Sequence, residues 1–232
     1  MALADALPGM MGLFGDGPDA RASGAGIGTG ITSSMKTYQP SDIRNCALVG
    51  HASAGKTLLS EALLVCGGGL NRLGSVAHGT TVSDYHDNER ERKISIQTSL
   101  LHLDWEGRKL NLMDCPGSLD FITEALGALR VADVAVVVVD ARDGVGVGTL
   151  QVWDWATQFA LPKILVVNGL DQENVDGEQV LAQLRQSFGE RVLPLSVALN
   201  PGPGLTQVLD VPRQAVLTYA ADRSGKFTEA AA

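Results

Sequence analysis

The chain has 232 residues and is poor in cysteine, in basic residues and in long hydrophobic runs. Its three cysteines, Cys46, Cys66 and Cys115, are odd in number and widely spaced. They fit neither a disulfide framework nor a zinc site, which indicates a reducing compartment. Only 18 Lys and Arg stand against 26 Asp and Glu, for a net charge of −8. This balance argues against direct binding of nucleic acid through its phosphates.

Membrane and secretory signals are also scarce. No apolar stretch reaches the roughly 20 residues that a membrane helix needs; the longest, residues 134–139, is bounded by Asp133 and Asp140. The first basic residue is Arg21, so the basic start of a secretory signal is missing. We therefore expect a cytoplasmic protein with no membrane partner.

Short aliphatic runs alternate with helical patterns from residue 44 onward. Residues 45–49, 134–139 and 163–167 are nearly all apolar, and residues 58–65 have a helical pattern. Strands that are apolar on both faces and alternate with helices are typical of a parallel sheet covered on both sides. Residues 95–105 and 109–113 indicate an antiparallel hairpin. The prediction is an α/β fold with a mainly parallel sheet, flanking helices on both faces and one antiparallel hairpin.

The first motif, G-x-x-x-x-G-K-T, lies between a predicted strand and a predicted helix. Its glycines let successive N–H groups turn toward a phosphate, and the helix N-terminus adds partial positive charge. Lys56 can reach the β- and γ-phosphates, while the Thr57 hydroxyl can bind Mg²⁺. The motif makes the fold a P-loop NTPase, and its predicted cradle is Gly50, His51, Ala52, Ser53, Ala54, Gly55, Lys56 and Thr57.

A second motif, D-x-P-G, directly follows the predicted strand at 109–113. The Asp114 carboxylate at the strand end can hold Mg²⁺ through water, and Gly117 lets its own amide approach a γ-phosphate. Alone, this tetrapeptide is a common turn. Paired with the phosphate loop, it predicts a second set of nucleotide contacts, which comprises Asp114, Cys115, Pro116 and Gly117.

The third motif is N-x-x-D, at the end of the predicted strand at 163–167. A carboxylate there can accept two hydrogen bonds from guanine N1 and N2, which adenine cannot supply; we assign this role to Asp171. Asn168 can tie the base loop to the phosphate loop. The alternative is a turn that caps the next helix.

Together these motifs, from residue 43 to about 171, resemble the guanine-nucleotide domain of translational GTPases, closest to elongation factor G and its divergent paralogues. Supporting stretches are the sequences IRN before the phosphate loop, RKISI at 92–96 and DCPGSLDF at 114–121. The resemblance implies GTP and GDP as ligands, Mg²⁺ as cofactor and a ribosome as partner. It also places Ser95 beside Thr57 and Asp114 as a magnesium ligand.

Several positions depart from the pattern of that family. The histidine that positions the attacking water is Ser118 here, and a hydroxyl cannot replace an imidazole that changes its protonation. With Lys56 and Ser118 at the catalytic positions, we expect binding to survive and hydrolysis to suffer. Gly169 replaces a lysine that covers the base, and Ser53 replaces an aspartate. Residues 67–92 resemble a switch that orders around a triphosphate, or else form a surface loop.

Three regions are expected along the chain. Residues 1–40 read as a flexible Gly- and Ala-rich leader, with Met35 as an alternative start. Residues 41–190 read as the GTP-binding domain, and residues 191–232 as the incomplete opening of an elongation factor G-type insert. The alternative for Ser196 is the last guanine-contacting motif of GTPases that lack the insert.

Four functions follow from these patterns. The first is a ribosome-stimulated GTP phosphohydrolase, and the second a guanine-nucleotide switch that hydrolyses poorly because of Ser118. The third is a truncated fragment without an independent role. The fourth, an ATP-using P-loop enzyme, is disfavoured by Asp171.

Overall fold

The computed structural model describes residues 36–220 and 225–232. Most of the predicted leader and the alternative start at Met35 lie outside the described residues. The described part begins with Lys36, which donates a hydrogen bond to Asp104, and Tyr38 donates to the same carboxylate. The last described residues of the predicted leader therefore dock on the hairpin, and the predicted boundary at residue 40 coincides with the start of the short helix η1 (Pro40–Asp42).

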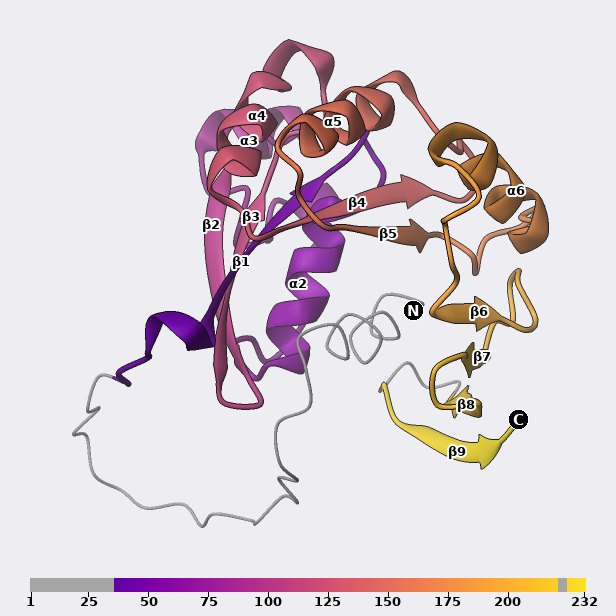
Figure 1. The fold of residues 1–232 in the computed structure, drawn as a ribbon. Coiled ribbons are helices and arrows are strands. Elements are labelled where there is room, and N and C mark those ends of the chain that lie inside the picture. The colour runs from indigo at the N-terminus through magenta and orange to yellow at the C-terminus, as the bar shows by residue number, and fades with distance from the viewer. Residues whose placement is uncertain (1–35, 221–224) are drawn as a thin grey trace, which may run out of the picture.

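A five-stranded sheet forms the centre of the molecule, in the order β2-β3-β1-β4-β5 (Figure 1). All neighbouring strands are parallel except β2 and β3, which form the predicted antiparallel hairpin. The strands are β1 (Ile43–Val49), β2 (Ser99–Trp105), β3 (Arg108–Asp114), β4 (Val134–Asp140) and β5 (Lys163–Asn168).

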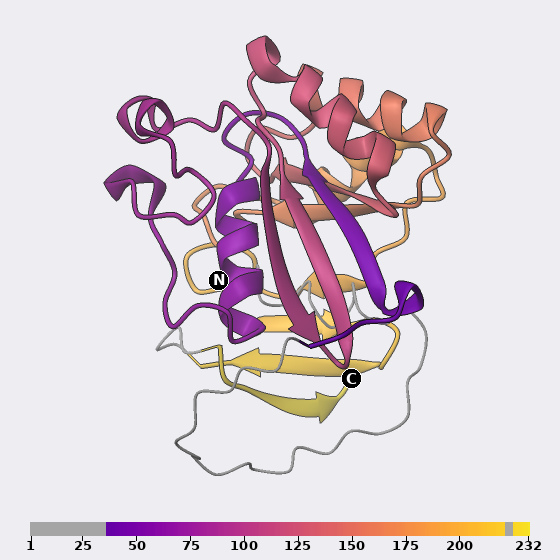
Figure 2. The ribbon, with the colours of Figure 1, turned by 90° about the vertical axis from the view of Figure 1, so that its left-hand side faces the viewer.

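Helices cover both faces of this sheet, as predicted. They are α2 (Lys56–Cys66), α4 (Thr123–Val131), α5 (Val147–Gln158) and α6 (Gly177–Phe188), and a further short helix is α3 (Asp87–Arg92). Helix α2 lies on one face, and α4 and α5 lie on the other (Figures 1 and 2). Helix α6 packs on Val139, and Leu165 packs against both the α6 cluster and the cluster under α4 and α5. Helix α6 therefore covers the same face of the sheet as α5.

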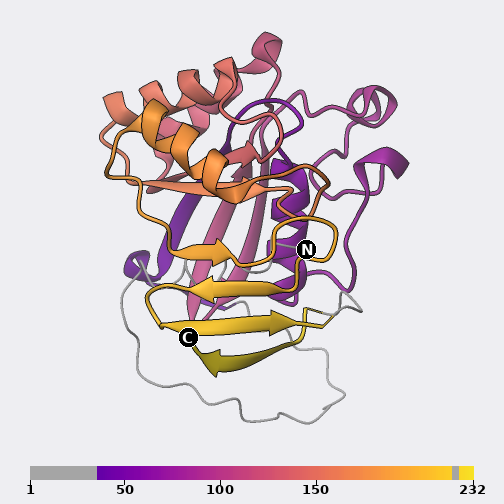
Figure 3. The same cartoon turned by 90° about the vertical axis from the view of Figure 1, so that its right-hand side faces the viewer.

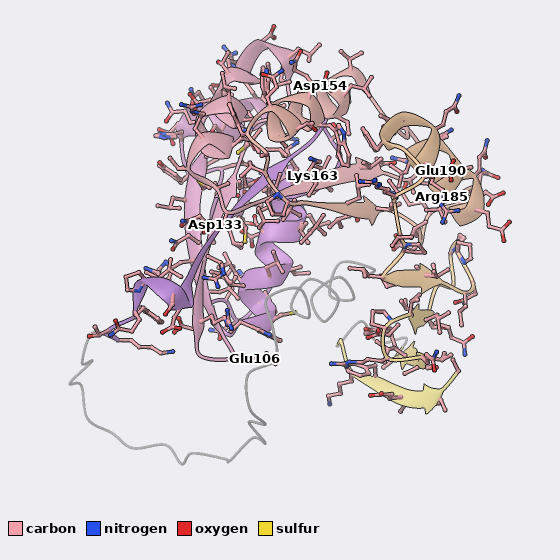
Figure 4. The ribbon with its side chains drawn as sticks, viewed as in Figure 1. Glu106, Asp133, Asp154, Lys163, Arg185 and Glu190 are labelled. Carbon is pink, nitrogen blue, oxygen red and sulfur yellow. The ribbon has the colours of Figure 1, made fainter. Side chains whose placement is uncertain are left out.

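The environment of strand β4 explains the unbroken apolar run at residues 134–139 of the sequence. Every residue of β4 is buried, because its side chains alternate between the two helix layers. Val136 and Val138 point toward the α2 side, whereas Val137 belongs to the cluster under α4 and α5. At its amino end, Asp133 accepts a 2.7 Å hydrogen bond from the Asn45 amide and fixes β4 against β1 (Figure 4).

The hairpin begins later than predicted. The expected strand at 95–105 starts only at Ser99, because the amides of Ile96 and Gln97 donate to the Glu89 carboxylate instead of a neighbouring strand. The segment 67–92 contains the single-turn helix η2 (Val76–His78) and α3. Thr81, Ser83 and Asp84 in this segment are buried, so part of it is packed and is not a surface loop.

A second, antiparallel sheet follows α6, in the order β6-β7-β8-β9 (Figure 3). Its strands are β6 (Ser196–Ala198), β7 (Gln207–Asp210), β8 (Ala215–Tyr219) and β9 (Phe227–Ala231). The sequence did not predict this sheet. Ser196 lies in β6 and pairs with Asp210 of β7, not with the first sheet. The assignment of this region to an insert stays a prediction.

Candidate functional site

The phosphate loop lies at the carboxyl end of β1, where it turns into α2. Gly50 has a φ of 142°, and a Cβ there would lie 2.3 Å from the Val138 carbonyl oxygen. Only glycine fits this approach of the loop to β4. Helix α2 begins at Lys56, so its free N-terminal amides face the loop.

Lys56 is 6% exposed and its Nζ lies inside the loop. It donates to the carbonyl oxygens of Gly50 (3.1 Å) and His51 (2.8 Å). Burial lowers the pKa of the amine, and the Asp114 carboxylate opposes that shift. The same donors can turn to the oxygens of a phosphate that enters the loop.

Gly117 brings the D-x-P-G motif against this loop. Its position is buried, and a Cβ there would lie 2.3 Å from the Lys56 Nζ and 2.6 Å from the His51 carbonyl oxygen. The neighbouring Ser118 is half-buried and begins the short helix η3 (Leu119–Phe121). Cys115 is buried, and burial raises its thiol pKa to about 12, so it is an inert packing residue.

Asp114 ends β3 and is 1% exposed. Burial raises its pKa to about 6. The Oδ2 atom accepts a 3.4 Å hydrogen bond from Ser60, whereas Oδ1 is buried with no hydrogen-bond partner within residues 36–220 and 225–232. An unsatisfied buried carboxylate oxygen is costly, and a hydrated cation would satisfy it.

The other predicted metal residues, Thr57 and Ser95, meet beside this carboxylate. Their hydroxyl oxygens are 3.4 Å apart, and Ser95 donates a 2.8 Å hydrogen bond to Asp84. Asp84 is 4% exposed, and its charge contributes to the raised pKa of Asp114. The sequence did not predict Asp84, because it lies in a polar stretch without a motif.

The arrangement fits Mg²⁺, which takes part of its ligand shell from water and phosphate, better than it fits a metal ion whose ligands are all protein side chains. In the described ranges no three His, Cys, Asp or Glu side chains come close enough to hold a metal. Mg²⁺ commonly uses one or two carboxylates and completes its shell with hydroxyls, water and substrate phosphates. Thr57, Ser95, Asp84 and Asp114 supply such a partial set.

The base loop follows β5. Asn168 donates a 3.0 Å hydrogen bond from Nδ2 to the Ala54 carbonyl, so the predicted tie between base loop and phosphate loop is present. Gly169 has a φ of 81°, a conformation that costs a lysine backbone strain. Asp171 is half-buried on the same loop.

A polar cavity of about 560 Å³ lies next to the base loop, between that loop, the end of β4 and α6. Its lining includes Arg142, Gln172, Gln179 and Gln183 and none of the predicted nucleotide residues.

No helix within the described residues is long and apolar enough to cross a membrane.

Comparison with known proteins agrees with this geometry. A family model described as the elongation factor Tu GTP binding domain matches residues 41–226. The chain belongs to this family. Its fold is therefore that of a P-loop NTPase, and it is a GTP-binding domain of the elongation factor G-like type.

Individual relatives place it more closely within the family. An elongation factor G-like protein of Mycobacterium tuberculosis is 39% identical over 82% of this chain, and a mitochondrial ribosome-releasing factor 2 of Culex quinquefasciatus is 35% identical over 85%. A crystal structure from Thermus thermophilus is 38% identical over 82% of the chain, with a TM-score of 0.76. The chain spans 26% of the length of the two curated relatives and 28% of the crystallised chain. Because mitochondrial and bacterial relatives both occur, the cytoplasmic location stays a prediction.

Proposed function

We propose that this chain binds GTP and GDP with Mg²⁺ and serves as the nucleotide-binding unit of an elongation factor G-like translation factor. The observation that carries the proposal is the convergence of three separate motifs on one loop. Gly117 lies against Lys56, and Asn168 is hydrogen-bonded to Ala54, so both later motifs border the phosphate loop.

Phosphate binding is assigned to the loop at residues 50–57 and to the Gly117 amide. The loop supplies oriented N–H groups and the Lys56 amine, which lets an acidic chain hold a highly charged anion locally. Mg²⁺ would be held by Thr57, Ser95 and Asp114, with Asp84 close by, and would neutralise charge on the phosphate oxygens. The unpartnered Asp114 Oδ1 supports this assignment.

Guanine recognition is assigned to Asp171, with Asn168 holding the base loop in place. The test is nucleotide binding by isothermal calorimetry in wild type and in Asp171→Asn. We expect wild type to bind GDP with Mg²⁺ and the variant to lose guanine affinity while gaining affinity for xanthosine diphosphate. Glu178→Gln, an exposed carboxylate in the first turn of α6, serves as control. Unchanged GDP affinity in Asp171→Asn would contradict the guanine assignment.

Hydrolysis is proposed to be slow, because Ser118 occupies the position of the water-orienting histidine. Catalysis at such sites is largely positioning and charge stabilisation, so a single lost group lowers the rate without weakening binding. Single-turnover hydrolysis with and without ribosomes tests this second function. A large gain in Ser118→His would support it, whereas rapid ribosome-stimulated hydrolysis by wild type would favour the active enzyme.

A ribosome is the proposed partner, on the strength of the relatives named elongation factor G-like protein and ribosome-releasing factor 2. Residues 191–232 are proposed to open an insert of the elongation factor G type.

A thermal-shift measurement with millimolar Mg²⁺-GTP distinguishes a chain that binds nucleotide from a fragment without function, because a ligand at 100 times its Kd adds about 2.7 kcal/mol to the free energy of unfolding. The absence of any shift would contradict nucleotide binding altogether.

A further inference from the structure

Two fully buried glutamates bracket the metal side of the nucleotide site. Glu61 lies on α2, is 0% exposed, and accepts backbone hydrogen bonds at both carboxylate oxygens. The Gly74 amide donates to Oε2 at 2.7 Å, and the Val82 amide donates to Oε1 at 2.6 Å. One side chain therefore closes the loop of residues 74–82 onto the helix of the phosphate loop.

The approach of this loop to Glu61 is close. A Cβ on Gly74 would lie 2.8 Å from Glu61 Oε2 and 2.6 Å from the Thr80 carbonyl oxygen. Ser83 and Asp84 come directly after Val82, and both are buried. The Ser83 carbonyl accepts a 2.6 Å hydrogen bond from the Ser99 hydroxyl, which ties the end of the loop to β2. Asp84 therefore enters the site from a segment that is fixed on both sides.

Glu89, on α3, makes a similar arrangement on the other side of Asp84. It is 1% exposed, and its Oε1 accepts from the amides of Ile96 (2.9 Å) and Gln97 (3.1 Å). These amides immediately follow Ser95, whose hydroxyl donates to Asp84. The Asp84–Ser95 pair thus lies between two segments that buried carboxylates hold in place.

Helix α2 joins these arrangements to the phosphate loop. It carries Lys56, Thr57 and Ser60 in the turns that precede or include Glu61, and Ser60 donates to Asp114. Hydrogen bonds from amides to an ionised carboxylate are about twice as strong as neutral ones. Removing the Glu61 carboxylate would leave the Gly74 and Val82 amides without their acceptor and would free residues 74–82.

We infer that Glu61 is a positioning residue that couples Mg²⁺ binding to nucleotide binding. By fixing residues 74–82 to α2, it holds Asp84, and through Asp84 also Ser95, next to Thr57 and Asp114 before any ligand arrives. Metal and phosphate then meet a prearranged set of oxygens. The inference rests on the proposed function, because it concerns the same Mg²⁺-nucleotide site.

The experiment measures the affinity of the full chain for a fluorescent GDP analogue, once with excess EDTA and once with millimolar Mg²⁺. The ratio of the two Kd values reports the coupling between metal and nucleotide. Glu61→Gln keeps the shape of the side chain but can accept only one of the two amides. We expect it to lower this ratio about tenfold, since one charge-assisted hydrogen bond is lost. The Kd in EDTA should stay nearly unchanged.

The control is Glu124→Gln, an exposed carboxylate that accepts a single amide hydrogen bond from Thr98. It should leave the ratio at the wild-type value. Amide hydrogen exchange in the nucleotide-free wild type gives a readout independent of any variant. The Gly74 and Val82 amides should be protected there, and rapid exchange at both would overturn the inference.

The outcomes separate the inference from the function on which it rests. A wild type that binds no nucleotide in either condition removes the proposed function, and the coupling role of Glu61 with it. A wild type with strong coupling and a Glu61→Gln variant with the same ratio overturns the inference alone. A reduced ratio in Glu61→Gln, with Glu124→Gln unaffected, supports it.

Discussion

The two halves of the nucleotide site are built differently. In the phosphate and metal half the charged side chains and Thr57 are buried: Lys56, Thr57, Asp84 and Asp114 are each at most 9% exposed, whereas Ser95 is half-buried and Ser53 is exposed. The base half, at Asn168 and Asp171, is half-buried, and its hydrogen bond to the phosphate loop runs from Asn168 to Ala54. Buried groups with several partners resist displacement, whereas an open loop adapts or moves. The phosphate half should therefore set affinity, and the base half should set which base is accepted.

The largest expected effect is a pH dependence of the free energy of unfolding, and it arises in the phosphate half from the buried Asp114. Its pKa is about 6 in the folded protein and 3.8 when unperturbed, so the folded state holds the proton more tightly than the unfolded state. Without ligand, the free energy of unfolding should fall as pH rises from about 4 through 6, by about 3 kcal/mol in total. Urea denaturation of wild type and Asp114→Asn across this range measures the difference.

Asp114→Asn should lack this component of the pH dependence, since an amide does not ionise. The variant should be more stable than wild type at pH 7 but insensitive to Mg²⁺. Saturating Mg²⁺-GDP should remove most of the fall in wild type, because the cation favours the ionised carboxylate. Parallel pH profiles for the two proteins would contradict the expectation.

A smaller effect is expected where the second motif meets the phosphate loop. Gly117→Ala would place a methyl group 2.6 Å from the His51 carbonyl oxygen and 2.7 Å from the Ala52 amide nitrogen, so the backbone of the loop must shift. We expect nucleotide affinity to fall roughly thirtyfold, or about 2 kcal/mol. Gly127→Ala is the matched control, because a Cβ there meets nothing within 4 Å. Equal GDP affinities for the two variants would show that the contact is unimportant.

The smallest effect is expected in the base half. Asn168→Ala removes the hydrogen bond to Ala54, which is worth about 1 kcal/mol, and should weaken both GDP and xanthosine diphosphate about fivefold. The loss should be equal for the two bases, because Asn168 holds the loop and Asp171 reads the base. A loss confined to GDP would mean that Asn168 itself discriminates the base and would weaken the division between the halves.

The sequence predicted those parts of the site whose backbone demands particular residues. Gly50 and Gly117 stand where no other side chain fits, and Lys56 and Asp114 accompany them at fixed spacing within strand-to-helix turns. Strand β4 was equally visible, because full burial on both faces leaves an unbroken run of apolar residues. In each case the local pattern and the tertiary environment impose the same requirement.

Asp84, Glu61 and Glu89 could not be predicted in the same way. Their partners are backbone amides or hydroxyls distant in sequence: Glu61 binds amides 13 and 21 residues away. Any residue except proline supplies such an amide, so the partner leaves no signature. The second sheet was missed for a related reason, since its strands of three to five residues are too short to establish a period.

The docking of Lys36 and Tyr38 on Asp104 has a practical consequence. This segment enters the molecule at the amino end of β1, whereas the phosphate loop lies at its carboxyl end. A strand of seven residues separates the two by about 23 Å. A fluorophore or surface tether attached near residue 36 would therefore lie far from the bound nucleotide. Immobilisation at that position would leave the nucleotide site accessible to ligand.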